Sequence, residues 1–205
     1  IGTRHLSLYQ LTIEAGTPFA DLYDKGRLAI PPPQIADDLF GLTRAITAAH
    51  RLDAYETSNH AAPGEESRHN LLSWRYGEYA GIGPGAHGRL IVDGIRTATS
   101  TEPLPERWLQ LVKASGSGII ERERLSRREM ADELLMMSLR LAEGVDLDRL
   151  AAVGCIRPGD NALPDLIESG HVALDPSTHR LRTTRAGSFV LNEVVRQLSG
   201  DFEEI

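Results

Sequence analysis

Residues 69–88 read HNLLSWRYGEYAGIGPGAHG, and no other stretch of the chain says as much about its fold. These twenty residues hold two histidines, one asparagine, one tryptophan and five glycines. Glycine removes the side chain where a backbone turns sharply or approaches a ligand closely. Ala80 and Ile82, between the glycines, predict the end of a strand. The stretch therefore favours the mouth of an α/β sheet, where a ligand meets backbone amides.

The composition is that of a globular protein with an excess of acidic residues. The chain has 205 residues, 41% of them hydrophobic, and 22 basic residues against 29 acidic ones give a net charge of −7. This balance argues against non-specific nucleic-acid binding, which needs phosphate-neutralising Lys and Arg. No apolar run is long enough to cross a bilayer and no signal peptide heads the chain, so we expect a cytoplasmic protein with at most peripheral membrane contact. The first residue is Ile1 rather than Met, which indicates the middle of a longer reading frame.

The segments before residue 69 follow a β-α-β order. Residues 5–13 alternate apolar and polar side chains and predict a strand, and residues 19–28 predict a short helix. Residues 35–52 place apolar side chains at three- and four-residue steps, which predicts an amphipathic helix. A short strand is expected at residues 54–57. This order is typical of an α/β unit.

After residue 88 the patterns predict two hairpins and mostly helices. Asp93-Gly94 indicates a type I′ turn between two strands, and Ser126 with Glu129 forms a capping-box pattern at the start of a long helix. The alternating charges at residues 121–124 indicate the solvated entrance to that helix. The other helices are expected at residues 103–114, 147–153, 163–169 and 185–198, and the second hairpin at residues 171–182.

Residues 69–88 contain the side chains best suited to bind a ligand. A neutral imidazole such as that of His69 can ligate iron or another metal, and an indole such as that of Trp74 can stack on a flat ring system. The alternative is that His69 and Asn70 cap a loop while Trp74 fills the gap beneath it. His87 also has two interpretations: a second ligand or proton donor facing the sheet mouth, or a surface histidine at the entry of a hairpin.

Polar residues also follow the two strands expected before residue 69. Residues 55–59 (YETSN), and Glu14 after the first strand, either line a ligand cavity or belong to ordinary polar loops. Cys155 is the only cysteine, and one thiol forms neither an intramolecular disulfide nor, by itself, a structural zinc or iron–sulfur site. The sequence has no Walker-type loop, no Ser-His-Asp hydrolase motif and no His-Glu-x-x-His zinc motif.

Four short motifs occur in a fixed order along the chain. They are Leu8–Glu14 (LYQLTIE), Tyr55–Ser58 (YETS), His69-Asn70-Leu71-x-x-Trp74 and Gly81–His87 (GIGPGAH). Together they resemble the radical SAM heme chaperones, a family also described as oxygen-independent coproporphyrinogen III oxidase-like proteins. The resemblance covers essentially the whole chain, since Thr183–Gly187 resembles the Leu-Thr-x-x-Gly entry to that family's last helix.

The resemblance implies an α/β fold in two domains. Residues 1–118 would be the terminal part of a partial (β/α) radical SAM barrel with its trailing hairpin, and residues 119–205 a small helical, winged-helix-like domain. The parent protein would bind heme and deliver it to acceptor proteins. The alternative within the family is oxidative decarboxylation of coproporphyrinogen III to protoporphyrinogen IX. A third hypothesis makes residues 121–205 a winged-helix interaction or DNA-binding module without catalysis, against which the acidic balance counts.

The resemblance also implies ligands and site residues. The residues implied to contact heme or to line the barrel lumen are His69, Asn70, Trp74, His87, Tyr9, Gln10 and Glu56. Among them His69 is the candidate ligand of heme iron. The family carries a Cys-x-x-x-Cys-x-x-Cys motif for a 4Fe–4S cluster, and most contacts to S-adenosylmethionine, in its N-terminal half. Neither is present here, so this chain alone is expected to be inactive. Ser73 stands where the family has the Tyr of His-Asn-x-x-Tyr-Trp, which keeps a hydroxyl but loses the aromatic ring.

Overall fold

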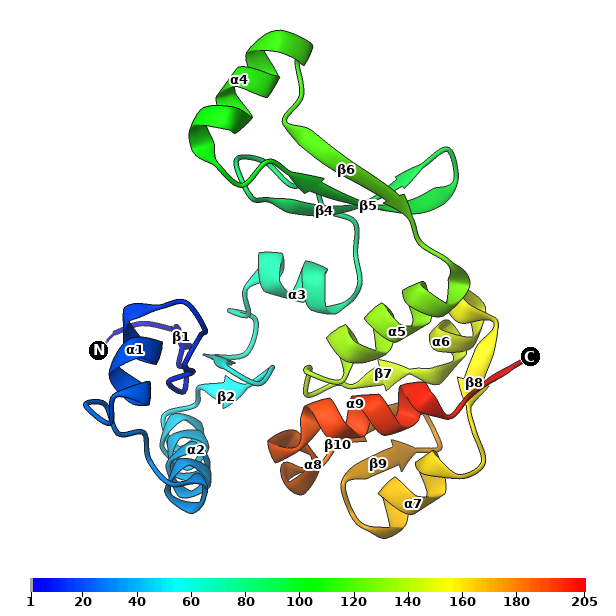
Figure 1. Ribbon diagram of the computed structural model, residues 1–205. Helices are drawn as coiled ribbons and strands as arrows, with labels where there is room; N and C mark the ends of the chain where they lie inside the picture. Colours follow the sequence, from blue (N-terminus) through cyan, green and yellow to red (C-terminus); the bar gives the residue numbers. More distant parts are fainter. Residues whose placement is uncertain (1) are drawn as a thin grey trace. The chain divides into compact units, whose positions relative to one another are not determined.

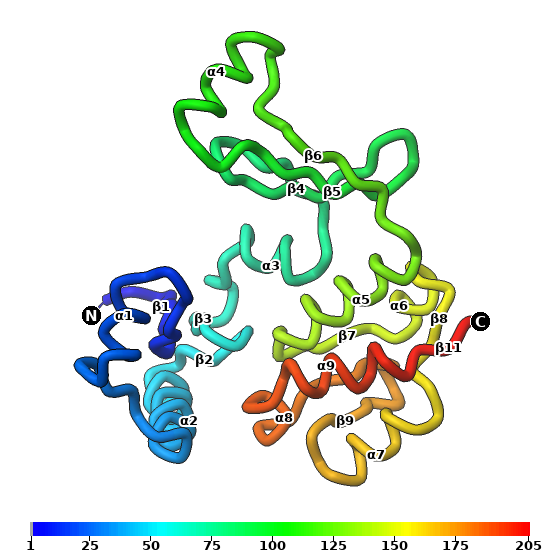
Figure 2. The backbone as a smooth tube through the Cα atoms, in the orientation of Figure 1, coloured from blue at the N-terminus to red at the C-terminus, as the bar shows by residue number. Residues whose placement is uncertain are grey.

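The computed structural model describes residues 2–205, whose contacts divide the chain after Glu66. The two compact units are Ile1–Glu66 and Ser67–Ile205. Figure 1 shows the helices and strands of both units, and Figure 2 follows the backbone through them and also labels β3 and β11. Each unit combines helices with small antiparallel sheets, so the fold is mixed α/β. The proposed division into residues 1–118 and 119–205 stays a prediction.

The first unit holds one three-stranded sheet and two helices. Its elements are β1 (His5–Ser7), α1 (Pro18–Asp24), α2 (Pro33–Ala49), β2 (Asp53–Ala54) and β3 (Asn59–Ala61). The strand order is β1-β3-β2, and β3 runs antiparallel to both neighbours. β1 and β2 therefore run parallel, as a β-α-β order requires, but the unpredicted strand β3 lies between them.

Local chemistry explains where these helices begin. The Thr17 hydroxyl accepts a hydrogen bond from the Ala20 amide at 3.3 Å, and Pro18 takes the first position of α1. α2 begins at Pro33, because proline lacks the N–H that the first turn leaves unpaired. The strand predicted at residues 5–13 is wrong in its length, since β1 ends at Ser7. Tyr9, two residues later, is 75% exposed.

The second unit begins with a helix and an antiparallel sheet. Its first elements are α3 (Arg68–Trp74), β4 (His87–Val92), β5 (Ile95–Thr101), α4 (Pro105–Ser115) and β6 (Ile119–Arg124). The strand order is β4-β5-β6, with each neighbouring pair antiparallel (Figure 1). The Asp93-Gly94 turn is confirmed, because both residues have the positive φ, 51° and 78°, that a type I′ turn needs.

Two predictions for this region are wrong. Residues 121–124 belong to β6 rather than to a helix entrance, since alternating charges also suit an exposed strand that pairs with β5. Ala80 and Ile82 do not end a strand. Only Tyr79 forms a bridge there, to Arg89, and Ile82 is 89% exposed.

The remaining residues form helices around two small sheets. The elements are α5 (Arg127–Ser138), β7 (Val145–Asp146), α6 (Leu147–Gly154), β8 (Ile156–Pro158), α7 (Ala162–Glu168), β9 (Val172–Asp175), β10 (Arg180–Thr183), α8 (Arg185–Phe189), α9 (Leu191–Gly200) and β11 (Phe202–Glu204). The sheets have the orders β7-β10-β9 and β11-β8. The capping box at Ser126 and Glu129 is confirmed.

The main core of the second unit lies among these last elements. α5 and α9, far apart in the sequence, lie side by side (Figures 1 and 2). Leu134 and Leu135 of α5 and Leu198 of α9 are fully buried. The single helix predicted at residues 185–198 is divided into α8 and α9. Phe189 and Val190 lie at this division and are 38% and 42% exposed.

Within residues 2–205, no helix is both long and apolar enough to cross a membrane.

Candidate functional site

The His-Asn-x-x-x-Trp motif lies on α3, a helix that the sequence patterns did not predict. The Ser67 hydroxyl accepts a hydrogen bond from the Asn70 amide at 3.3 Å and so caps the helix. Residues four apart share a helix face. His69 and Ser73 therefore lie on one face of α3, and Asn70 and Trp74 lie on another. His69 is exposed, whereas Asn70 and Trp74 are half-buried. The helix therefore presents the imidazole to solvent.

Trp74 forms a cation–π contact with Arg140. The guanidinium carbon of Arg140 lies 4.5 Å from the centroid of the indole ring. Such a contact stabilises by about 0.5–1 kcal/mol at a partly exposed site. Trp74 thus contacts the residues that follow α5, as expected of a side chain that fills a gap beneath the motif.

A polar network joins the end of α3 to α5. The buried Tyr76 hydroxyl donates to Glu133 Oε2 at 2.9 Å, and Arg89 binds the same carboxylate with Nη2–Oε1 at 2.7 Å. Arg96 lies over the Tyr76 ring, 3.6 Å from its centroid. Burial raises the pKa of Tyr76, and the Glu133 carboxylate adds to this effect. The network fixes the residues after the motif against the core.

The glycine-rich segment folds back on its own backbone. A Cβ at Gly81 would lie 2.6 Å from the carbonyl oxygen of His87, and one at Gly88 would lie 2.6 Å from the Thr99 hydroxyl. The Thr101 hydroxyl donates to the Gly83 carbonyl at 2.6 Å and accepts from the Ala86 amide at 2.8 Å. These close approaches explain the glycines at positions 81 and 88 without a bound ligand.

His87 is the first residue of β4. It lies opposite Ser100 of β5, and its side chain is exposed. This position suits the interpretation as a hairpin-entry histidine and leaves the imidazole accessible.

The remaining predicted site residues belong to the first unit. Tyr9 and Gln10 line one cavity of about 420 Å³, and the Gln10 amide donates to the Ala36 carbonyl at 3.1 Å. Glu56 is 1% exposed, and its Oε1 accepts from the Ser58 amide at 2.7 Å and from Asn59 Nδ2 at 2.5 Å. Glu56 thus holds the turn that leads into β3.

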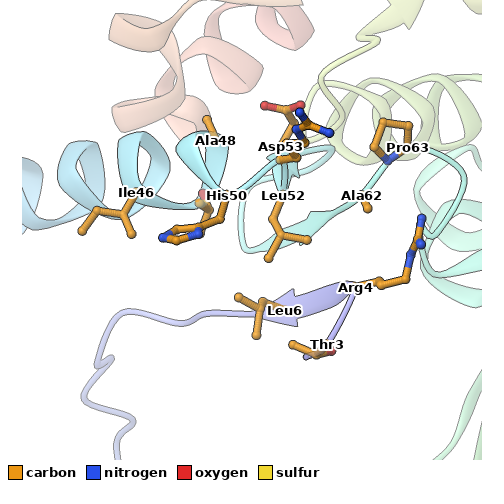
Figure 3. Close-up of a pocket in the computed structure, with 12 residues that line it drawn as sticks. Thr3, Arg4, Leu6, Ile46, Ala48, His50, Leu52, Asp53, Ala62 and Pro63 are labelled. Atoms are coloured by element: carbon orange, nitrogen blue, oxygen red, sulfur yellow. The ribbon is translucent and has the colours of Figure 1, made fainter. Parts of the chain in front are cut away.

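A second cavity of the first unit, of about 800 Å³, lies beside the end of α2 (Figure 3). Leu6, Ile46 and Leu52 form part of its apolar wall. Arg4 also lines it and forms an ion pair with Glu65 at 3.0 Å. No site residue was predicted here.

His60 was not predicted as a site residue, yet it lines the 420 Å³ cavity and is 2% exposed. Neither ring nitrogen makes a hydrogen bond of ordinary geometry, but the Ser58 backbone is close enough to act as a hydrogen-bond partner of the ring. Burial lowers the pKa of His60 first, and the positive charge of Arg44 lowers it further. A histidine in a short polar segment carries no sequence pattern that reveals such burial.

Within residues 2–205, no three His, Cys, Asp or Glu side chains lie close enough together to hold a metal ion. Cys155 is half-buried beside Arg127. A 4Fe–4S cluster needs several thiolates, so the residues of this chain do not fit one.

Comparisons with known proteins place these elements in a family. Residues 125–190 match the family described as HemN C-terminal domain. Over 98% of its length the chain is 33% identical to the mitochondrial radical S-adenosyl methionine domain-containing protein 1 of Bos taurus, of which it covers 47%. Over 98% it is 31% identical to the heme chaperone HemW of Bacillus subtilis, of which it covers 52%. The chain is a homologue of the HemW heme chaperones.

The fold agrees with this relationship. The solved structure of the radical SAM enzyme coproporphyrinogen III oxidase (HemN) from Escherichia coli matches 96% of this chain with a TM-score of 0.65. The match covers 48% of that enzyme at 15% identity, so it shows the fold alone. The chain spans about half the length of the curated relatives it matches. The family resemblance predicted from the four motifs is thus confirmed.

Proposed function

We propose that this chain is the heme-binding part of a radical SAM protein of heme metabolism that delivers heme to acceptor proteins. The observation that carries the proposal is the exposed imidazole of His69 on α3, in the motif His-Asn-x-x-x-Trp. The names of the HemW relatives, at 31–32% identity, support heme as the cargo. Delivery of heme to acceptor proteins is proposed from the word chaperone in these names.

The chemistry of α3 suits an axial contact to heme. One imidazole is sufficient to ligate heme iron on one side, so a cluster of three ligands is not required. We propose His69 as that ligand, with His87 as the second candidate, and Asn70 and Trp74 as residues that support the helix. The contact between Trp74 and Arg140 supports a positioning role for the indole. Tyr9, Gln10 and Glu56 are proposed to line the lumen of a partial radical SAM barrel.

The radical chemistry would require residues outside this chain. We propose that a parent protein binds the 4Fe–4S cluster and S-adenosylmethionine elsewhere, because the single Cys155 cannot hold a cluster. Coproporphyrinogen III oxidation is the second candidate, favoured by the HemN fold match. That match shows the fold alone at 15% identity, whereas the 31–33% identical relatives include proteins named heme chaperones. Heme delivery is therefore the better supported function.

The last elements are proposed to form a winged-helix-like domain. The chain order α5, β7, α6, β8, α7, β9, β10 and the sheet β7-β10-β9 support this assignment, and β8 pairs outside that sheet with β11. A role in DNA binding finds little support, because α7 reads ALPDLIE and contains no basic residue. We propose that the protein acts in the cytoplasm.

Hemin titration of the chain tests the role of His69. We expect His69→Ala to weaken hemin binding at least tenfold and to shift the Soret band, because the iron loses its axial nitrogen. His50→Ala, which removes another exposed histidine, serves as the matched control and should leave both values unchanged. An unchanged affinity and Soret band for His69→Ala would contradict the proposal, and His87→Ala would then show whether the second candidate is the ligand.

A further inference from the structure

The solvent-facing side of α3 carries a cation beside the proposed heme ligand. Arg68 and His69 are consecutive residues of this helix, and both are exposed. Asn70, Leu71 and Trp74, by contrast, are half-buried. A helix turns by about 100° per residue, so two consecutive side chains can share one broad exposed side. α3 therefore presents a guanidinium and an imidazole to solvent together.

The charge of Arg68 is available to a ligand. Within the described residues 2–205, its side chain forms no hydrogen bond, ion pair or ring contact. Glu65, three positions earlier in the chain, is already paired with Arg4 at 3.0 Å. An arginine side chain stays protonated throughout the physiological pH range. Arg68 thus places an unneutralised positive charge next to His69.

The arginine at the other end of α3 differs in this respect. Arg75, the C-cap residue of the helix, donates hydrogen bonds to both carboxylate oxygens of Glu143, at 2.8 and 2.7 Å. These hydrogen bonds hold the pKa of Glu143 below its usual range, so the carboxylate is ionised at neutral pH and offsets the charge of Arg75. Of these two arginines, Arg68 is the one whose guanidinium can take an external anion.

The chemistry of heme supplies such an anion. Heme has two propionate groups, which are negatively charged at neutral pH. One bond between an imidazole and the iron leaves the porphyrin free to rotate about that bond, so the imidazole alone does not fix where the propionates lie. A guanidinium pairs with a carboxylate through two parallel hydrogen bonds, which set the direction of the carboxylate as well as its position.

We propose that Arg68 binds a propionate of heme and thereby selects porphyrins with free carboxylates. The inference rests on the proposed function, in which His69 binds the iron; Arg68 is a positioning residue that recognises the edge of the porphyrin. Because water competes for an exposed ion pair, the contribution to affinity should be about fivefold, which corresponds to about 1 kcal/mol.

Titration of the complete chain with hemin and with hemin dimethyl ester, whose propionates carry no charge, tests this proposal. Arg68→Gln should weaken hemin binding about fivefold and leave the affinity for the ester unchanged. The Soret band should stay in place, because the iron keeps its imidazole. Arg107→Gln removes another exposed arginine of the second unit and is the charge-matched control. It should bind both compounds like the unmodified chain.

Two results would overturn the proposal. One is an unchanged hemin affinity for Arg68→Gln, and the other is an equal loss of affinity for hemin and its ester, which indicates damage to α3 instead. His69→Ala separates the inference from the proposed function. If His69→Ala shifts the Soret band while Arg68→Gln binds hemin normally, only the role of Arg68 is wrong. If His69→Ala leaves the Soret band unchanged, His69 is not the iron ligand and the inference fails with it.

Discussion

Replacing Glu133 with Ala should destabilise the second unit more than any other single loss of a carboxylate discussed above. Glu133 accepts hydrogen bonds from Tyr76 at 2.9 Å and from two nitrogens of Arg89, at 2.7 and 3.0 Å. The side chains of Arg89 and Glu133 are only 22% and 20% exposed. The substitution therefore leaves a guanidinium and a hydroxyl without their partner in a largely dry environment.

The size of the effect follows from this burial. Breaking a fully buried ion pair costs about 3–5 kcal/mol, and an exposed pair contributes about 0–1 kcal/mol. With about four fifths of each side chain buried, the loss of the Arg89 pair should cost about 2 kcal/mol. The unpaired Tyr76 hydroxyl adds about 1 kcal/mol. We expect a total of about 3 kcal/mol for Glu133→Ala, and about 1 kcal/mol for Tyr76→Phe, which keeps the ring under Arg96.

Urea unfolding followed by tryptophan fluorescence measures these values. Both tryptophans of the chain, Trp74 and Trp108, lie in the second unit, so their emission reports on it. Glu143→Ala is the matched control, because Glu143 forms a similar bidentate pair with Arg75 but both side chains are more exposed. It should cost less than about 1 kcal/mol. If Glu133→Ala costs no more than this control, the network does not stabilise the unit.

Three further outcomes are expected. Gly187→Ala should lower stability by about 3 kcal/mol in thermal unfolding, since its Cβ would lie 1.9 Å from the His171 carbonyl oxygen; Gly200→Ala, with open space around it, should be neutral or slightly stabilising. Ser126→Ala removes the cap of α5 and should cost about 1 kcal/mol in urea unfolding; no change would contradict a structural role for the cap. The pKa of the His60 imidazole is lowered from 6.5 in the folded chain, so at pH values below 6.5 the unfolded chain binds a proton at His60 more readily than the folded chain does. The unfolding free energy should therefore fall as the pH drops below 6.5. His60→Gln should show a shallower decline by circular dichroism, and parallel slopes would refute this reasoning.

Much of the second unit follows from local sequence patterns. The Asp93-Gly94 turn and the Ser126–Glu129 capping box are set by neighbouring residues, and both are observed. The helix α3 was missed because its seven residues have too few apolar repeats to show a period. Packing of its end against α5 through Tyr76 stabilises it instead.

In the candidate site, too, some features can be predicted from the sequence and others depend on tertiary packing. The motif His69-Asn70-x-x-x-Trp74 is contiguous, so its residues and their resemblance to the heme chaperones can be read from the chain alone. Their exposure cannot, because it depends on what packs around α3. The contact of Trp74 with Arg140 joins residues 66 positions apart, and no local pattern predicts it.

His60 is the clearest case of a property that depends on tertiary structure. The sequence places it in a short polar segment, where a histidine is ordinarily solvated. In the folded chain β3 pairs between β1 and β2, and His60 lines a cavity together with residues of α2. The His60 side chain is only 2% exposed there. Turns and caps arise from contacts between near neighbours, and the family motifs are contiguous stretches of residues. All three are therefore visible in the sequence. Burial and ion pairing arise when distant segments exclude water from one another, and only the folded chain specifies which segments meet.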